Sequence, residues 1–176
     1  KTTIRSSFSN QGEICLCGSR IYVHEKIYEQ FKTEFVKETK KLKIGDPFNS
    51  ENNLGALVSK QHFEKVMYYI NLAKEEGGKI LTGGYKPELD ENFSEGYFIL
   101  PTIIEGLENN CRTIQEEIFG PVVTIIPFKN TEEVIEYAND SKYALSASIW
   151  TKDISNALLV AEKIEAGTVW VNTWML

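Results

Sequence analysis

The last third of the chain constrains the fold most, because short apolar runs alternate there with helical patterns. The run Val122-Val123-Thr124-Ile125-Ile126 has no polar alternation, which is typical of a strand buried on both faces. Thr131 and Asp153 are predicted to cap the two helices that follow. Strand, helix, strand, helix and strand in this order predict right-handed crossovers and a parallel sheet with helices on both sides. The predicted strands are residues 121–128, 145–150 and 168–174.

The earlier part of the chain adds helices with one apolar side, so the whole chain is predicted to have an α/β fold. We expect a three-layer α/β/α arrangement around a mainly parallel sheet. In the helix after Asp153, the positions predicted to point inward are Ile154, Ala157, Leu158, Ala161 and Ile164. The other predicted elements are the end of a helix within residues 1–11, strands at 20–23, 79–82 and 97–104, and helices at 25–42 and at 60–76, the latter capped by Ser59.

Length, charge and cysteine content exclude several classes of protein. A chain of 176 residues suits a single domain, and a net charge of −6 argues against a nucleic-acid partner. Three cysteines form no disulfide framework, which predicts a reducing, cytoplasmic location. With two histidines the chain offers no zinc site, and we expect no metal. No apolar run is long enough to cross a membrane, so no membrane partner is expected.

A cysteine lies in a glycine-flanked turn near the start of the chain. Cys15 stands between Gly12 and Gly18, which permit tight turns on either side. If Cys15 is a nucleophile, its own backbone N–H can point at the oxyanion formed when it attacks a carbonyl. The alternative is that Cys15 and Cys17 are small buried apolar residues that only pack.

Two motifs carry a resemblance to a known family. Phe8-x-Asn10-x-Gly12-x-x-Cys15, followed by Gly18-Ser19-Arg20, resembles the catalytic-cysteine motif of NAD(P)-dependent aldehyde dehydrogenases. The second motif, Glu116-Glu117-Ile118-Phe119-Gly120-Pro121-Val122, follows at a matching distance, and the resemblance covers essentially all 176 residues. Glu13 stands where the family usually has Gln. It therefore adds a negative charge near the thiol, which would disfavour the thiolate unless a cation or hydrogen bond offsets the charge.

The resemblance implies oxidation of an aldehyde to a carboxylate. Cys15 would attack the aldehyde to give a thiohemiacetal, hydride would pass to nicotinamide, and water would hydrolyse the resulting thioester. Glu117 would then bind the nicotinamide ribose hydroxyls and Phe119 would flank the nicotinamide ring, whereas His62 and Lys65 would contact the adenosine-side ribose of NAD or NADP. The alternatives are a solvated carboxylate for Glu117, core packing for Phe119 and a plain helix surface for His62 and Lys65.

The resemblance also indicates a substrate class. Ile14 and Leu16 flank the nucleophile and could line an aldehyde pocket, and Trp174 lies near family substrate-pocket positions, although an aromatic residue at a strand end is more often core. The residues around Cys15 and Trp174 look most like the branch that oxidises 2-aminomuconic or 2-hydroxymuconic semialdehyde. Betaine aldehyde and simple aliphatic aldehydes remain alternatives.

Several family parts have no match in this chain, which opens at Lys1 without Met. They are the general-base glutamate, the oxyanion asparagine, the N-terminal cofactor domain and the C-terminal oligomerisation segment. Residues 1–176 are therefore predicted to be a single catalytic domain from a longer homo-oligomeric protein, inactive alone and with most of the cofactor site elsewhere.

Two other functions stay open at this point. The first is a non-catalytic structural or binding domain of the same fold. The second is a nicotinamide-independent cysteine acyltransferase or hydrolase, which would need a histidine near the thiol as its base. Neither His24 nor His62 is placed by sequence to serve Cys15 in that way.

Overall fold

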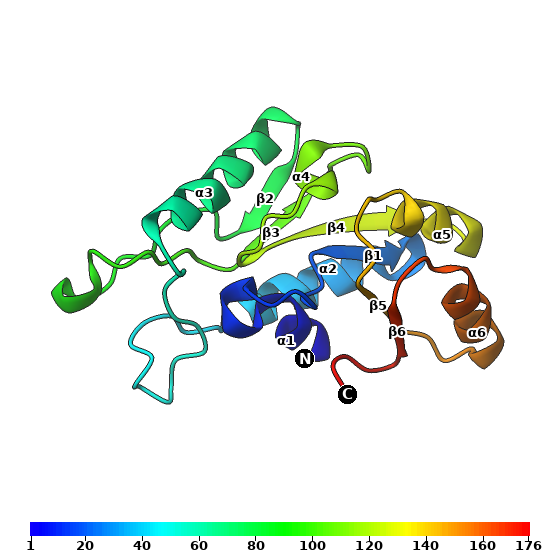
Figure 1. Ribbon diagram of the computed structural model, residues 1–176, viewed down its shortest axis with the longest axis horizontal. Helices are drawn as coiled ribbons and strands as arrows, with labels where there is room; N and C mark the ends of the chain where they lie inside the picture. The colour runs from blue at the N-terminus through cyan, green and yellow to red at the C-terminus, as the bar shows by residue number, and fades with distance from the viewer.

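A four-stranded sheet in the order β1-β4-β3-β2 forms the centre of this computed structural model, which describes residues 1–176 (Figure 1). β4 pairs in parallel with both β1 and β3, and β2 pairs antiparallel with β3. The predicted α/β fold with a mainly parallel sheet is confirmed. The strands are β1 (Arg20–His24), β2 (Lys79–Thr82), β3 (Thr102–Glu105) and β4 (Val122–Phe128).

Both faces of this sheet are covered, because successive side chains of β4 point in opposite directions. Val122 and Ile126 pack with α3 in one apolar cluster, whereas Val123 and Ile125 pack with α1 and α2 in another. All four side chains are at most 6 % exposed. Figure 1 shows the same layers, with α3 on one side of the sheet and α1 and α2 on the other. The covering helices are α1 (Thr2–Phe8), α2 (Glu25–Thr39) and α3 (Lys60–Glu75).

The last two strands do not join the central sheet, so the prediction of one parallel sheet for the last third is wrong. β5 (Ser146–Ile149) and β6 (Thr168–Val171) pair in parallel with each other and form a separate two-stranded sheet. Both edges of β4 are already occupied by β1 and β3, so no backbone donors or acceptors remain on β4 for β5. The remaining elements are α4 (Arg112–Gln115), α5 (Thr131–Asn139), α6 (Ile154–Lys163) and the 3₁₀ turns η1 (Ser9–Gly12) and η2 (Glu91–Phe93).

The predicted strand at residues 97–104 begins only at Thr102. Pro101 has no N–H to donate to a neighbouring strand. The backbone before it bonds to loops instead: the Leu100 N–H donates to the Tyr85 carbonyl, and the Tyr97 carbonyl accepts from the Leu57 N–H. This segment is therefore an ordered loop that holds the approach to β3.

Helix caps follow the expected residue types with one exception. Ser59 and Asp153 cap α3 and α6 as predicted, by accepting backbone N–H groups of the first helical turn. The cap of α5 is Asn130 rather than Thr131, since Asn130 has extended backbone angles and its side chain accepts the Glu133 N–H at 2.9 Å. The Thr131 hydroxyl donates to Asn156 of α6 instead.

The apolar side of α6 is only partly covered. Ala157 and Val160 are buried, whereas Ile154 is 66 % and Leu158 63 % exposed, which contradicts their predicted inward positions. α6 packs against β5, β6 and α5, and these short elements cover only part of its apolar side. None of the helices is long and apolar enough to cross a membrane.

Candidate active site

Cys15 lies on an exposed turn that α1 and η1 lead into. The turn is closed by a hydrogen bond from the Cys17 N–H to the Ile14 carbonyl at 2.9 Å. Cys15 is exposed, so it does not serve as a packing residue, and its backbone N–H has no acceptor within the chain. The neighbouring Ile14 and Leu16 are half-buried. The turn thus presents a thiol and an adjacent free N–H to the same surface.

Two side chains tie this turn to the segment that precedes α3. The Gln11 carboxamide accepts the Gly55 N–H at 3.1 Å and donates to the Ala56 carbonyl at 3.4 Å. The Glu13 carboxylate accepts the Val58 N–H at 3.2 Å. Three side-chain hydrogen bonds therefore fix the turn against residues 55–58, although these segments are more than 40 residues apart in sequence.

Trp174 holds the turn from the other end of the chain. Its indole N–H donates to the Leu16 carbonyl at 2.8 Å, and the Arg5 guanidinium lies 5.5 Å from the centre of its ring. The side chain is 5 % exposed. Trp174 therefore contacts the backbone next to Cys15, and its assignment to an aldehyde pocket stays a prediction.

The second motif lies directly against the cysteine turn because of strand pairing. β1 and β4 are parallel neighbours, so the segments that precede them meet at one edge of the sheet. The closest approach is between Gly12 and Gly120: a Cβ built on Gly12 would lie 2.2 Å from the Gly120 carbonyl oxygen. A Cβ on Gly120 would lie 2.7 Å from a methyl carbon of Val66 on α3. Only glycine fits at these two positions, so this contact explains why both motifs contain one.

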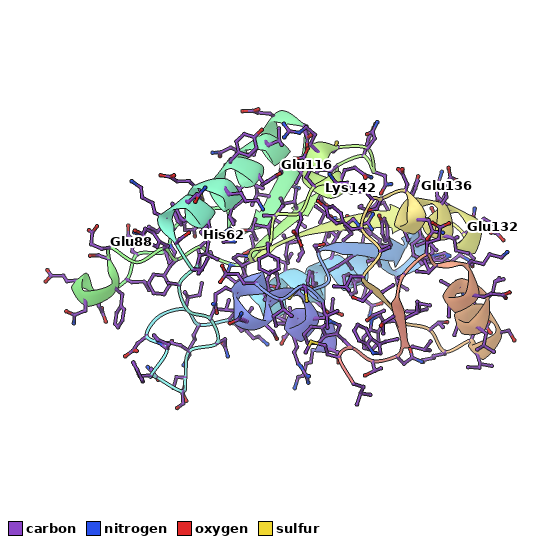
Figure 2. The ribbon with its side chains drawn as sticks, in the orientation of Figure 1. His62, Glu88, Glu116, Glu132, Glu136 and Lys142 are labelled. Carbon is purple, nitrogen blue, oxygen red and sulfur yellow. The ribbon has the colours of Figure 1, made fainter.

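The loop between α4 and β4 carries Glu117 and Phe119. Ile118 is buried and anchors the loop, whereas Glu117 is exposed and Phe119 half-buried. Phe119 has a φ of +61°, a conformation that side chains with a Cβ rarely adopt. Its carbonyl oxygen is 2.6 Å from Nε2 of His62. Figure 2 shows His62 at the N-terminal end of α3, facing the sheet.

Glu116 fixes the start of the same loop. Its carboxylate accepts two hydrogen bonds from the Arg112 guanidinium, at 2.8 and 3.0 Å, and one from the Tyr69 hydroxyl at 2.6 Å. These donors, Arg112 first, lower the pKa of Glu116 to about 2. α3 therefore holds this loop at both ends, through Tyr69 at Glu116 and through His62 at Phe119.

A cavity of about 450 Å³ opens at the N-terminal end of α3. It brings together the predicted cofactor residues His62 and Lys65. The helix dipole at this end favours negative charge, and the Lys65 ammonium group adds a cation. These groups fit the polar ribose and phosphate portions of a dinucleotide. The cavity is lined by Val58, Ser59, Gln61, His62 and Lys65.

The other two cysteines are poor nucleophiles. Burial raises the pKa of Cys17 to about 11, and its thiol lies 3.8 Å from the Ser9 carbonyl. Burial also raises the pKa of Cys111 above its ordinary value. The exposure of Cys15, together with the raised pKa of the Cys17 and Cys111 thiols, singles out Cys15 among the three.

The sequence did not reveal several residues that shape this site. The sequence marks Glu13 only as a departure from a family motif, and the spacing of residues does not predict which groups its carboxylate contacts. Tyr69, which also holds Glu116, carries no local signal, whereas the four-residue spacing of Arg112 and Glu116 is one that a helical pair can use. Gly12 and Gly120 did carry a signal in the sequence, because a glycine in each of two separate motifs can indicate a close backbone contact.

Comparison with known proteins agrees with the two motifs. The chain matches the Aldehyde dehydrogenase family over residues 1–176. It is 49 % identical to a 2-aminomuconic semialdehyde dehydrogenase of Danio rerio, over 99 % of this chain and 36 % of that protein. A Pseudomonas 2-aminomuconic 6-semialdehyde dehydrogenase is 40 % identical over 98 % of this chain and 35 % of that protein.

The fold comparison gives the same result. The structure of betaine aldehyde dehydrogenase from Staphylococcus aureus in complex with NAD+ superposes with a TM-score of 0.96 at 36 % identity, covering 99 % of this chain and 35 % of that one. The chain thus spans about a third of the length of the proteins it matches.

The Gly12 contact predicts a destabilising effect of any side chain there. Gly12→Ala should lower the free energy of unfolding by about 2–5 kcal/mol, because the new Cβ meets a carbonyl and the φ of +73° is strained. Gly77→Ala is the matched control: Gly77 has a φ of +89° with nothing within 4 Å, so the loss should be only about 1 kcal/mol. Urea denaturation measures both, and equal losses would contradict the contact.

The thiol environments predict selective alkylation. With limiting iodoacetamide at about pH 8, Cys15 should react before Cys17 and Cys111. This pH is about three units below the pKa of Cys17, so only about one Cys17 thiol in a thousand is ionised. Labelling of Cys17 should rise only as the pH approaches its pKa of about 11. Peptide mapping by mass spectrometry measures the order, and preferential labelling of Cys111 would refute it.

Proposed function

This chain belongs to the aldehyde dehydrogenase family, and we propose that the protein containing it oxidises an aldehyde to a carboxylate with NAD or NADP, using Cys15 as nucleophile. The main observation behind this proposal is the contact of Gly12 with Gly120, which brings the segment leading into the exposed Cys15 turn against the residue that follows the Glu117–Phe119 loop.

Cys15 carries the covalent chemistry in this proposal. Its thiolate adds to the aldehyde carbon, a C–S bond forms, and the carbonyl π electrons move to oxygen. The resulting oxyanion accepts a hydrogen bond from the backbone N–H of Cys15. This N–H has no other acceptor in the chain. After oxidation, water cleaves the thioester and releases the carboxylate and the Cys15 thiolate.

Three residues of this chain, Glu117, Phe119 and Lys65, bind the cofactor in this proposal. NAD or NADP supplies the acceptor for the hydride that leaves the substrate carbon. The exposed Glu117 carboxylate can accept two hydrogen bonds from the hydroxyls of the nicotinamide ribose. Phe119 flanks the nicotinamide ring, and Lys65 faces the adenosine-side ribose from the cavity at α3, which His62 also lines.

The proposed substrate is a muconic semialdehyde. The 2-aminomuconic semialdehyde dehydrogenases of Danio rerio and Mus musculus are 49 % and 47 % identical to this chain, whereas the betaine aldehyde dehydrogenase is 36 % identical. Ile14 and Leu16, half-buried on either side of the thiol, are proposed to line the aldehyde pocket together with Trp174.

The geometry favours this chemistry over a nicotinamide-independent hydrolase. A hydrolase needs an imidazole beside the thiol, but Nε2 of His62 bonds to the Phe119 carbonyl. Nδ1 of His24 accepts the Lys26 N–H at the far end of β1. A purely structural domain has no need of an exposed cysteine with a free N–H.

The rest of the catalytic apparatus is proposed to lie outside this chain. The relatives are about three times as long, and their additional length leaves room for a cofactor domain, a general-base glutamate and an oxyanion asparagine. From family membership we also propose that the intact protein is a cytoplasmic homo-oligomer with residues 1–176 as its catalytic domain.

The role of Cys15 is testable in the intact protein. Cys15→Ala should lower kcat by about 10³-fold or more, because no other group in the turn can form the thioester. Cys17→Ser is the control and should retain most activity, since that thiol lies in the same segment but is partly buried. NADH formation at 340 nm with 2-aminomuconic semialdehyde, betaine aldehyde and acetaldehyde measures both activity and substrate preference. Full activity in Cys15→Ala would refute the proposal.

The isolated chain should have no turnover. Residues 1–176 contain the proposed nucleophile, but neither the base nor the main cofactor domain is expected within them. Incubation of the chain alone with NAD and muconic or aliphatic semialdehydes should therefore produce no NADH. Sustained NADH formation would show that these residues suffice.

A further inference from the structure

Two side chains and one backbone carbonyl from distant parts of the chain meet between the cysteine turn and the Phe119 loop. Nε2 of His62 lies 2.6 Å from the Phe119 carbonyl oxygen and 3.5 Å from Oε1 of Glu13. Both side chains are shielded, with 14 % of His62 and 10 % of Glu13 exposed. The three residues belong to three different segments, namely the cysteine turn, α3 and the loop before β4.

The chemistry of these groups fixes where the proton is. A carbonyl oxygen only accepts hydrogen bonds, so Nε2 of His62 must carry a proton and donate it to Phe119. The Glu13 carboxylate accepts the Val58 N–H at 3.2 Å, and its Oε1 lies 3.5 Å from Nε2 of His62, whose proton is directed at Phe119. The carboxylate of Glu13 near the thiol is therefore bonded by the segment before α3 and lies against the His62 ring of α3.

The same contact supports an unusual backbone conformation. Phe119 has a φ of +61°, which a residue with a Cβ holds only when its surroundings fix it. His62 contacts Phe119 twice, through the carbonyl and through an edge-to-face arrangement of the rings with centroids 6.3 Å apart. Loss of the imidazole would remove both contacts from the residue proposed to flank the nicotinamide ring.

We propose that His62 is a positioning residue that acts through Phe119, and that Glu13 holds His62 in place. The expected effect of His62 on catalysis rests on the proposed function, whereas the positioning of Phe119 by His62 does not depend on it. A positioning role for His62 and a contact of His62 with the ribose predict different kinetics. Loss of a ribose contact raises the KM for NAD, whereas loss of the Phe119 orientation lowers kcat.

Kinetics of the intact protein separate these two roles. His62→Ala should lower kcat about tenfold or more while the KM for NAD changes less than about threefold. His62→Gln should restore most of kcat, since its amide N–H can donate to the Phe119 carbonyl. His24→Asn is the control: it changes the other histidine, keeps a capping side chain for α2 and should leave activity unchanged. A raised KM with unchanged kcat in His62→Ala would overturn the inference.

A double-mutant cycle tests the part played by Glu13. Glu13→Ala should lower kcat less in His62→Ala than in the wild-type background, because the bond to the Val58 N–H is lost in both but the contact with the imidazole only in the latter. Additive losses in the two variants would show that Glu13 acts independently of His62 and would overturn the coupling.

Hydrogen exchange tests the structural part without any cofactor. Backbone amides in a peptide covering residues 115–121 should exchange faster in His62→Ala than in the wild type or in His24→Asn. Unchanged exchange there would overturn the inference whatever the activity. If exchange rises as expected but the wild-type protein reduces no NAD with any aldehyde, the positioning of Phe119 by His62 stands and the proposed function fails.

Discussion

The contact between Gly12 and Gly120 is the constraint on which the rest of the site depends. Two backbone segments approach so closely there that a single methyl group on Gly12 would overlap a carbonyl oxygen. The contacts of His62 with Glu13 and Phe119 exist only because this approach is possible. Backbone contact of this kind leaves little room for adjustment, since glycine has no side chain that can rotate away.

The sheet explains why the two segments meet at all. Each one precedes a strand, and β1 and β4 are parallel neighbours, so their starting ends lie at the same edge. The pairing extends outward, because the Thr124 N–H donates to the Ser19 carbonyl just before β1 begins. The buried residues of β4 that interact with α1, α2 and α3 thus stabilise the arrangement of the site as well as the core.

Local patterns in the sequence predicted local structure well. β2 has the predicted bounds, and Ser59 and Asp153 cap their helices because a short polar side chain before an apolar periodicity is a strong signal. Thr131 was the wrong cap since two suitable residues are adjacent, and only backbone angles distinguish Asn130 from it.

Features that depend on partners were predicted less well. Strand patterns in the last third did not reveal that β1 and β3 occupy both edges of β4, so the separate β5–β6 pair was missed. Periodicity identified the apolar side of α6, but it could not tell what lies against Ile154 and Leu158. In the site, the motifs identified Cys15, Glu117 and Phe119, whereas the roles of Glu13 and Arg112 follow only from three-dimensional contacts.

The hydrogen bond from Trp174 to Leu16 joins residues 158 positions apart. A contact of such long range forms only after the ends of the chain have been brought together, which makes it a late event in folding. During synthesis the cysteine turn leaves the ribosome long before its tryptophan partner exists. The bond that holds the Leu16 carbonyl, one residue from the thiol, therefore forms only after Trp174 has been made.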